Sequence, residues 1–189
     1  MTATLSHIIQ KPVETVEEFE QWLALQPHLA EKRFEFLDGK KIEKAGMKPE
    51  EFFIVKFLTR LFAKTSAYER GDELLTEADT YINESRKRIA DLAYFTVAQI
   101  EDARTKVRPQ TVFPIEILSP SEDLTHIENK VADYFSAGAK LVWYISPQKE
   151  RIYAYTAPEE VKIYSGSTVC TANPVLPDFS FRVEEMFAW

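Results

Sequence analysis

The stretch TVFPIEILSPSED, residues 111–123, places an acidic residue inside an apolar run. Residues 112–118 are mostly aliphatic, β-branched or aromatic, and they predict a strand that lies in the core of the protein. Glu116 is at the centre of this strand, and a carboxylate that is buried without compensation is strongly destabilising. The fold must therefore supply a cation or hydrogen-bond donors to Glu116.

The residues after this strand predict a helix that carries a cationic side chain on its second turn. Thr125 and Glu128 have the T-x-x-E spacing of a capping box, and Gly138 suits the position just after the helix end. Lys130 lies beside the apolar stripe of this helix, so its long aliphatic stem can return the ammonium group towards Glu116. The stripe consists of Ile127, Val131, Tyr134 and Phe135.

A second acidic residue, Asp91, lies in another apolar strand, predicted at residues 88–97. Its face of that strand also carries Ile89, Ala93 and Phe95. If the two strands are neighbours, the carboxylates of Asp91 and Glu116 repel each other, and a bound cation would hold both ionised. Oxygen ligands without nearby Cys or His favour Mg²⁺ or Mn²⁺ over zinc. On this view, Glu116→Gln leaves the metal-free protein at least as stable as the parent.

The rest of the chain predicts a single α/β domain, residues 1–189, with a mixed central sheet flanked by helices. Asp38-Gly39 marks a hairpin within residues 33–44, because this dipeptide favours a tight turn between strands. The other predicted strands are residues 74–82, 140–147 and 151–156. The other predicted helices are residues 15–26, 49–66 and 97–103, with an extended segment and a short helix at residues 174–189.

The composition excludes several classes of protein. The single cysteine, Cys170, excludes an internal disulfide framework, and the scattered histidines make no zinc site. No apolar run is long enough to span a membrane and the first residues lack a secretory signal, so we expect a cytoplasmic protein. The net charge of −7 argues against a protein that coats nucleic acid non-specifically. A nuclease remains compatible with it, because an acidic metal site can coexist with local basic patches.

The order of these segments resembles that of the PD-(D/E)XK nuclease superfamily and, more closely, of its bacterial Uma-two family. The resemblance runs through RFEFLDGKKIEK, RIADLAYF, PIEILSPSED, the helix with Lys130, LVWYISP and PVLPDFSF. It implies a restriction-endonuclease-like core and metal-dependent hydrolysis of phosphodiester bonds, with DNA as the default substrate. Related nucleases commonly cut duplexes as dimers, so we also expect a homodimer, for which an aromatic-rich surface would supply the interface.

The resemblance also implies roles for individual residues. Asp91, Glu116 and the backbone carbonyl of Ile117 would hold Mg²⁺, for which Mn²⁺ is the expected substitute. Lys130 would orient or activate the attacking water, and Glu35 would position the metal or its water. The chain departs from the family pattern in having Leu118 where a lysine is usual; Lys130 matches the position from which a helical lysine replaces it. Smaller departures are Ala90 in place of a proline and the lack of a histidine in PEEFFIV, at the start of the helix after the hairpin.

Other interpretations remain open at this point. Glu116 and Lys130 could form a purely structural ion pair, in which case Glu116→Gln destabilises the metal-free protein. The chain could be a catalytically silent nucleic-acid-binding or regulatory protein that keeps the nuclease fold, or an interaction protein with no nucleic-acid role. Ser119 and Ser121 are expected to be turn or capping residues rather than nucleophiles. The basic clusters within residues 40–44, 86–88 and 104–108 are each expected to be solvated.

Overall fold

The computed structural model of the protein describes residues 12–105, 107–119 and 122–188. The strands of its central sheet are β1 (Arg33–Leu37), β2 (Lys40–Lys44), β3 (Glu73–Asn83), β4 (Arg86–Phe95), β5 (Phe113–Ile117), β6 (Val142–Ser146), β7 (Arg151–Ala157) and β8 (Glu160–Ser165). Their order is β2-β1-β4-β5-β6-β7-β8, and β3 pairs with β4 outside this path. The pairs are antiparallel except β5 and β6, which are parallel. A second sheet joins β9 (Val169–Ala172) and β10 (Leu176–Arg182).

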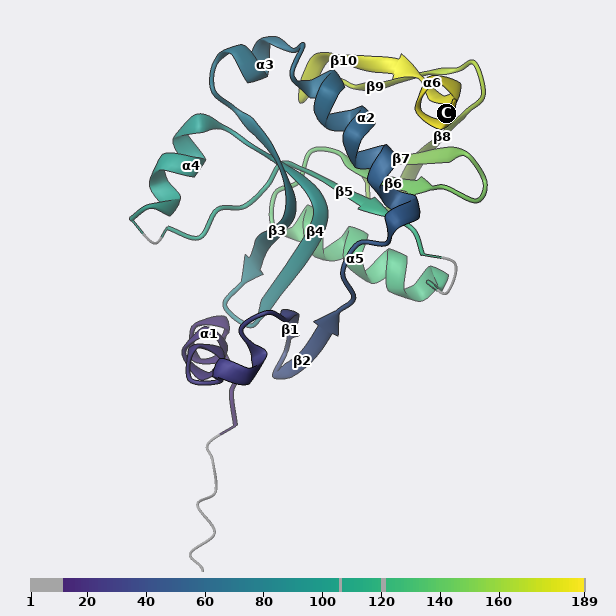
Figure 1. Ribbon diagram of the computed structural model, residues 1–189. Helices are drawn as coiled ribbons and strands as arrows, with labels where there is room; N and C mark the ends of the chain where they lie inside the picture. The colour runs from purple at the N-terminus through teal and green to yellow at the C-terminus, as the bar shows by residue number, and fades with distance from the viewer. Residues whose placement is uncertain (1–11, 106, 120–121, 189) are drawn as a thin grey trace, which may run out of the picture.

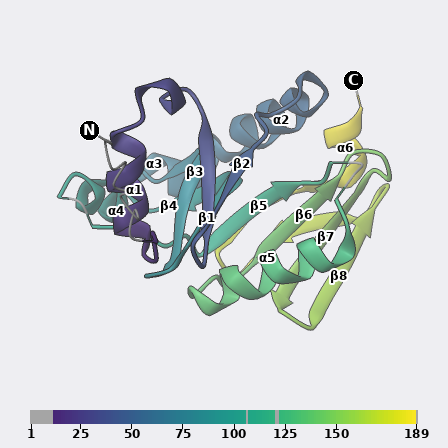
Figure 2. The ribbon, with the colours of Figure 1, turned by 90° about the horizontal axis from the view of Figure 1, so that it is seen from below.

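Helices cover both faces of the central sheet (Figure 1). They are α1 (Val16–Ala24), α2 (Phe52–Phe62), α3 (Ser66–Glu69), α4 (Val97–Ala103), α5 (Leu124–Ser136) and α6 (Val183–Phe187), with short 3₁₀ turns η1 (Pro27–Leu29) and η2 (Pro49–Glu51). The helix α2 lies beside α6 and the small sheet (Figure 1), whereas α5 crosses the strands β5 to β7 on the other side (Figure 2). This mixed α/β architecture is the predicted one.

The largest core lies between α2, the small sheet and one face of the central sheet. Its centre is Trp143 of β6, whose ring packs edge-on against Phe113 with centroids 4.9 Å apart and stacks on Phe179 at 5.8 Å. Ile115 and Ile117 of β5 belong to this core. Because side chains alternate along a strand, Glu116 points to the opposite face, towards α5.

Two smaller cores complete the packing. On the α5 side, Val131 and Tyr134 belong to a buried cluster with Ala93 and Tyr144 of the sheet. At the hairpin end of the sheet, Phe19 of α1 stacks on Phe36 of β1 with ring centroids 5.0 Å apart. The second core brings Lys130, on the same helix as Val131, close to Glu116.

The structure corrects the predicted start of α5. Its N-cap is Asp123, whose side chain accepts a hydrogen bond from the backbone N–H of His126 at 2.8 Å. The predicted capping box of Thr125 and Glu128 is therefore wrong by two positions. The predicted end is confirmed, since Gly138 follows the helix with a φ of 96°, a conformation that favours glycine.

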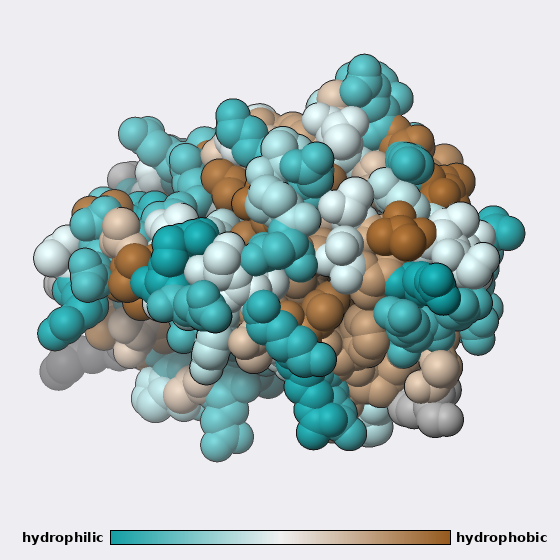
Figure 3. All heavy atoms as spheres, turned by 90° about the horizontal axis from the view of Figure 1, so that it is seen from above, coloured by the Kyte–Doolittle hydropathy of each residue, from teal (hydrophilic) through white to brown (hydrophobic). Residues whose placement is uncertain are grey.

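Most aromatic side chains lie inside the protein. The aromatic-rich surface that was expected to supply a dimer interface is therefore not found among the described residues. In the described part of the chain, the aromatic residues among the strongly exposed large apolar ones are Phe52 and Tyr68. Figure 3 shows the face on the side of α2, where apolar patches are interspersed with polar side chains. The described residues contain no helix that is long and apolar enough to cross a membrane.

Candidate functional site

The site lies at a gap in the hydrogen-bonded edge of β4. The strand β3 pairs along nearly the whole length of β4, so β1 and β5 share its other edge. Along that edge β1 pairs at residues 86–87 and β5 at residues 92–94. Between them, side chains take the place of a strand: the N–H of Ile89 donates to Glu35 Oε1 at 3.2 Å, and its carbonyl accepts from Lys44 Nζ at 2.6 Å.

The other edge of β4 is also irregular at this point. In the ladder with β3, Thr76 pairs with Leu92 and Ala78 with Ala90, but Glu77 between them has a φ of 47°. A non-glycine residue in this left-handed region costs about 1–3 kcal/mol, and such residues cluster at functional sites. The strain at Glu77 lies directly across the ladder from Asp91.

Asp91 and Glu116 line one cavity of about 390 Å³, which we call the carboxylate cavity. The register of β4 and β5, with Leu92 opposite Ile115, places the two acids across from each other on adjacent strands. The backbone N–H of Ile117 donates to Asp91 Oδ2 at 2.6 Å. The cavity is further lined by Lys44, Lys48, Glu51, Ser119, Glu122 and Lys130, among others.

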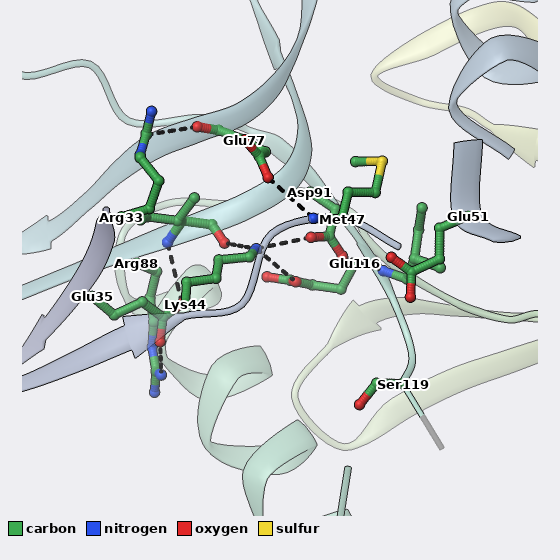
Figure 4. Close-up of polar contacts among 12 residues, drawn as sticks. Arg33, Glu35, Lys44, Met47, Glu51, Glu77, Arg88, Asp91, Glu116 and Ser119 are labelled. Atoms are coloured by element: carbon green, nitrogen blue, oxygen red, sulfur yellow. Dashed lines mark hydrogen bonds and ion pairs between the residues drawn. The ribbon is translucent and has the colours of Figure 1, made fainter. Parts of the chain in front are cut away.

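The ammonium group of Lys44 lies between the two carboxylates. Its Nζ is 2.8 Å from Asp91 Oδ1 and 4.0 Å from Glu116 Oε2 (Figure 4). The side chain of Lys44 is only 15% exposed, so the expectation that the lysines of residues 40–44 are solvated is wrong for this one. Burial opposes its charge, but Glu116 and Asp91 outweigh burial and raise the pKa of Lys44.

Glu116 is compensated from the α5 side as well. Its Oε2 lies 3.2 Å from Lys130 Nζ, as the helix pattern predicted, and its Oε1 accepts a short hydrogen bond from the hydroxyl of Tyr134. Burial alone raises the pKa of the Glu116 carboxyl. The ammonium groups of Lys130 and Lys44 outweigh this effect, so the pKa of Glu116 lies below its usual value and the group is ionised.

Lys130 is surrounded by carboxylates and remains protonated. Besides Glu116, its Nζ lies 3.8 Å from Glu122 Oε1 and 4.0 Å from Glu35 Oε1. Burial disfavours the charge, but these acids, Glu116 first, hold the pKa of Lys130 above its usual value. In the metal-free protein Lys130 is therefore protonated, and it is a source of positive potential at the cavity wall.

Asp91 behaves differently from Glu116. Burial and the neighbouring charge of Glu116 raise the pKa of Asp91 from 3.8 to about 6, against the opposing effect of Lys44. The two acids of the site therefore titrate in different pH ranges.

Glu35 lies behind Lys130, in a buried network of ion pairs. Its Oε2 accepts from Arg88 Nη1 at 2.8 Å, and Arg88 also bonds Asp133 of α5, with Nη2 2.7 Å from Oδ2. Asp133 in turn accepts from Arg86 Nη1 at 2.6 Å. The structure thus places Glu35 against Arg88 and Ile89, outside the lining of the carboxylate cavity, with Lys130 between Glu35 and that cavity.

The polar atoms available for a cation suit a hard metal ion. Within the described ranges, no three Asp, Glu, His or Cys side chains come together as a ligand cluster. The carboxylates of Asp91 and Glu116 are two hard oxygen donors in one cavity, and they would fit an ion such as Mg²⁺, which keeps several waters and needs only one or two carboxylates. The ammonium of Lys44 sits between these carboxylates, so a cation that bound both would have to displace it.

A family model described as "Putative restriction endonuclease", named Uma2, matches residues 16–184. The chain belongs to the Uma2 family. Among solved structures, the chain is similar to one titled as a "putative nuclease belonging to DUF820" from Anabaena variabilis, with a TM-score of 0.75 and 17% sequence identity. That match covers 93% of this Uma2 chain and 98% of the other, and at this identity it shows a shared fold. No curated protein matches the chain.

Proposed function

We propose that the protein hydrolyses phosphodiester bonds in nucleic acid, DNA by default, with a divalent cation held by Asp91, Glu116 and the carbonyl of Ile117. Membership of the Uma2 family supports a restriction-endonuclease-like nuclease. The observation that carries the metal site is the convergence of Asp91 and Glu116 in one cavity, on adjacent strands, beside two ammonium groups. Mg²⁺ is the proposed ion and Mn²⁺ its substitute.

The chemistry of the site divides between the cation and the lysines. When bound, the cation lowers the pKa of a water molecule and neutralises charge on the phosphate. Lys130, held by Glu116 and Glu122 and kept protonated, supplies a fixed positive charge at the cavity wall. Glu35 positions Lys130 from behind. Lys44, when displaced from Asp91, is free to contact the phosphate backbone.

Cleavage of plasmid and single-stranded DNA with Mg²⁺, Mn²⁺ or EDTA tests this proposal. Cleavage that requires metal and is lost in both Asp91→Asn and Glu116→Gln supports it. Metal-independent cleavage, or unchanged cleavage in either variant, contradicts the site.

A catalytically silent nucleic-acid-binding or regulatory protein is the second candidate. The observation that favours it is the position of Lys44, which satisfies both acids without any metal. Titration with Mn²⁺ separates the two candidates, because the silent protein shows no binding that depends on Asp91 and Glu116.

A homodimer is the assembly expected of the nuclease. The aromatic side chains supply no obvious interface for it, because most of them are buried. Light scattering across micromolar concentrations tests the assembly, and a monomer throughout that range contradicts it.

A further inference from the structure

A second cavity, of about 300 Å³, adjoins the carboxylate cavity. Ser119 and Glu122 line both, so the two cavities share a wall. The second is also lined by Tyr144, Tyr153 and Tyr155, and we call it the tyrosine cavity. In Figure 4 the shared residue Ser119 lies beyond Glu116, on the loop that follows β5. A ligand in the tyrosine cavity would thus be a neighbour of whatever binds Asp91 and Glu116.

The three tyrosines lie on one face of the sheet. Tyr144 of β6 is directly opposite Tyr153 of β7, and Tyr155 follows two residues later on the same face. The ring of Tyr155 meets that of Tyr144 edge-on, with centroids 6.1 Å apart and an interplanar angle of 78°. Tyr153 and Tyr155 are half-buried, so their rings are partly open to a ligand. The cavity therefore offers aromatic surfaces to a flat molecule.

Tyr144 brings a polar group that the protein itself does not use. The residue is 1% exposed, and its hydroxyl is buried without a hydrogen-bond partner in the part of the chain that the structure describes. A buried polar group of this kind is rare in folded proteins and costs stability. The hydroxyl is buried as the structure stands, so a ligand in the cavity meets the tyrosine rings rather than this hydroxyl.

The charges of the lining favour an uncharged ligand. Of the charged side chains in the described lining, Glu122 is acidic and Lys149 is basic, whereas the carboxylate cavity holds several of each sign. The exposed amide of Gln148 and the exposed apolar side chain of Leu124 complete the rim. A nucleobase is planar, uncharged and polar at its edge, and it stacks well on aromatic side chains.

We propose that the tyrosine cavity receives the unpaired base of a nucleotide next to the phosphate that is cleaved. This inference rests on the proposed function, because the phosphate would lie at Asp91 and Glu116. A base inside a duplex must leave its stack before it can enter such a cavity. The preferred substrate class is accordingly nucleic acid with an unpaired nucleotide at the cleavage point: a single strand, a bulge or a frayed end.

Equilibrium binding tests the cavity separately from cleavage. The probes are a fluorescent oligothymidylate and a strand of the same length made wholly of abasic residues, both in Ca²⁺ without Mg²⁺ or Mn²⁺. The parent protein binds the oligothymidylate roughly tenfold or more tightly than the abasic strand, because stacking on tyrosine is lost in the latter. Tyr153→Ala and Tyr155→Ala remove most of this difference, whereas Tyr68→Ala, at an exposed tyrosine of α3, keeps it.

Two further variants test the cavity without removing side chains that pack in the core, so that an effect on binding is not confused with unfolding. Leu124 is 65% exposed, so Leu124→Trp can obstruct the cavity mouth without removing core packing, and it lowers binding of the oligothymidylate but not of the abasic strand. Tyr144→Phe removes only the buried, unpartnered hydroxyl and keeps the ring, so its melting temperature is equal to or above that of the parent and the base-dependent binding is kept.

The outcomes separate this inference from the proposed function. Base-dependent binding through Tyr153 and Tyr155, without any cleavage, supports the cavity and contradicts the nuclease. Cleavage of a perfect duplex and of a bulged duplex at equal rates, unchanged in the tyrosine variants, overturns the cavity and leaves the nuclease intact. Equal binding of the two strands by the parent, or no binding of either, also overturns the cavity.

Discussion

Lys44 and Asp91 form an ion pair of 2.8 Å that joins the β1–β2 hairpin to the centre of β4. The ammonium also lies 4.0 Å from Glu116, so it takes the position between two acids that a metal would need. If a metal binds both acids, as we propose, Lys44 must move away from this position. Substitution of Lys44 is the most direct way to distinguish a structural role of Asp91 and Glu116 from a role in metal binding.

Lys44→Met is expected to lower stability and to raise metal affinity. Without the ammonium, Asp91 and Glu116 repel each other, so the free energy of unfolding falls by roughly 1–3 kcal/mol. A cation no longer has to displace a competitor, and Mn²⁺ binds about tenfold more tightly if about 1.4 kcal/mol of competition is removed. Thermal unfolding and calorimetric titration measure both effects. Lys48→Met, in the same cavity, is the control, and weaker Mn²⁺ binding by Lys44→Met would contradict displacement.

Metal affinity is expected to depend on pH through Asp91. Burial and the charge of Glu116 raise its pKa from 3.8 to about 6, so its stabilising contribution is complete below about pH 3.8 and is lost as pH rises through about 6. A metal binds the ionised carboxylate, so Mn²⁺ affinity rises about tenfold per pH unit up to about pH 6 and then levels off. Calorimetric titrations at several pH values check this. In Asp91→Asn the residual Mn²⁺ affinity should not rise with pH in this range. A rise that persists in this variant would mean that another group titrates.

Glu116→Gln is expected to destabilise the metal-free protein, contrary to the expectation from sequence. The low pKa of Glu116 means that its ionised form stabilises the fold, because Lys130 and Lys44 more than offset burial. The free energy of unfolding falls by about 3 kcal/mol, the lower end for a broken buried pair, since Lys130 keeps Glu122 at 3.8 Å. Denaturant unfolding measures this loss.

The same variant should also lose its response to metal. Mn²⁺ raises the melting temperature of the parent, because a ligand that binds only the folded state stabilises it, and it does so far less in Glu116→Gln. Glu128→Gln, at an exposed position of α5, is the control and behaves like the parent. A parent protein indifferent to Mn²⁺ would leave Glu116 with a structural role alone.

Arg88→Met is expected to be the most destabilising of these changes. The side chain of Arg88 is 3% exposed and lies between Glu35 and Asp133, so its loss leaves two buried carboxylates without their shared cation. The expected loss is about 3–5 kcal/mol. Lys32→Met, which breaks the exposed pair with Glu43, is the control and costs at most about 1 kcal/mol. Denaturant unfolding compares the two, and similar values would argue against a rigid network.

Local patterns predicted much of the fold. The helix predicted at residues 97–103 is α4 (Val97–Ala103), and the hairpin around Asp38-Gly39 is β1 and β2. The strand β8 was not predicted, although Val161 and Ile163 alternate with polar residues; in the structure these two side chains are about half-exposed, and Tyr164 is the buried residue of the strand. The strand β9 was too short to recognise.

The site was predictable only where the signal is local. An acid inside an apolar strand, as at Asp91 or Glu116, stands out in the sequence. Lys44 does not, because Lys40 and Lys41 beside it are exposed and its own burial depends on the gap in β4. The sequence likewise assigned Tyr134 to an apolar stripe, and only the packing of α5 on β5 directs its hydroxyl to Glu116.

Among the described residues, the pairing of β1 with β4 consists of two residue pairs, Phe36 with Lys87 and Leu37 with Arg86. At the gap beyond these pairs, side chains connect the hairpin to β4. Lys44 donates hydrogen bonds to both Asp91 and the carbonyl of Ile89. We therefore expect that a cation bound to Asp91 and Glu116 would displace Lys44 and break both bonds at once. The β1–β2 hairpin would then open locally more often. We expect its backbone amide hydrogens to exchange with solvent faster, whereas the exchange rates of β3 stay unchanged. Occupancy of the proposed site would thus change the local opening of a hairpin at the edge of the sheet.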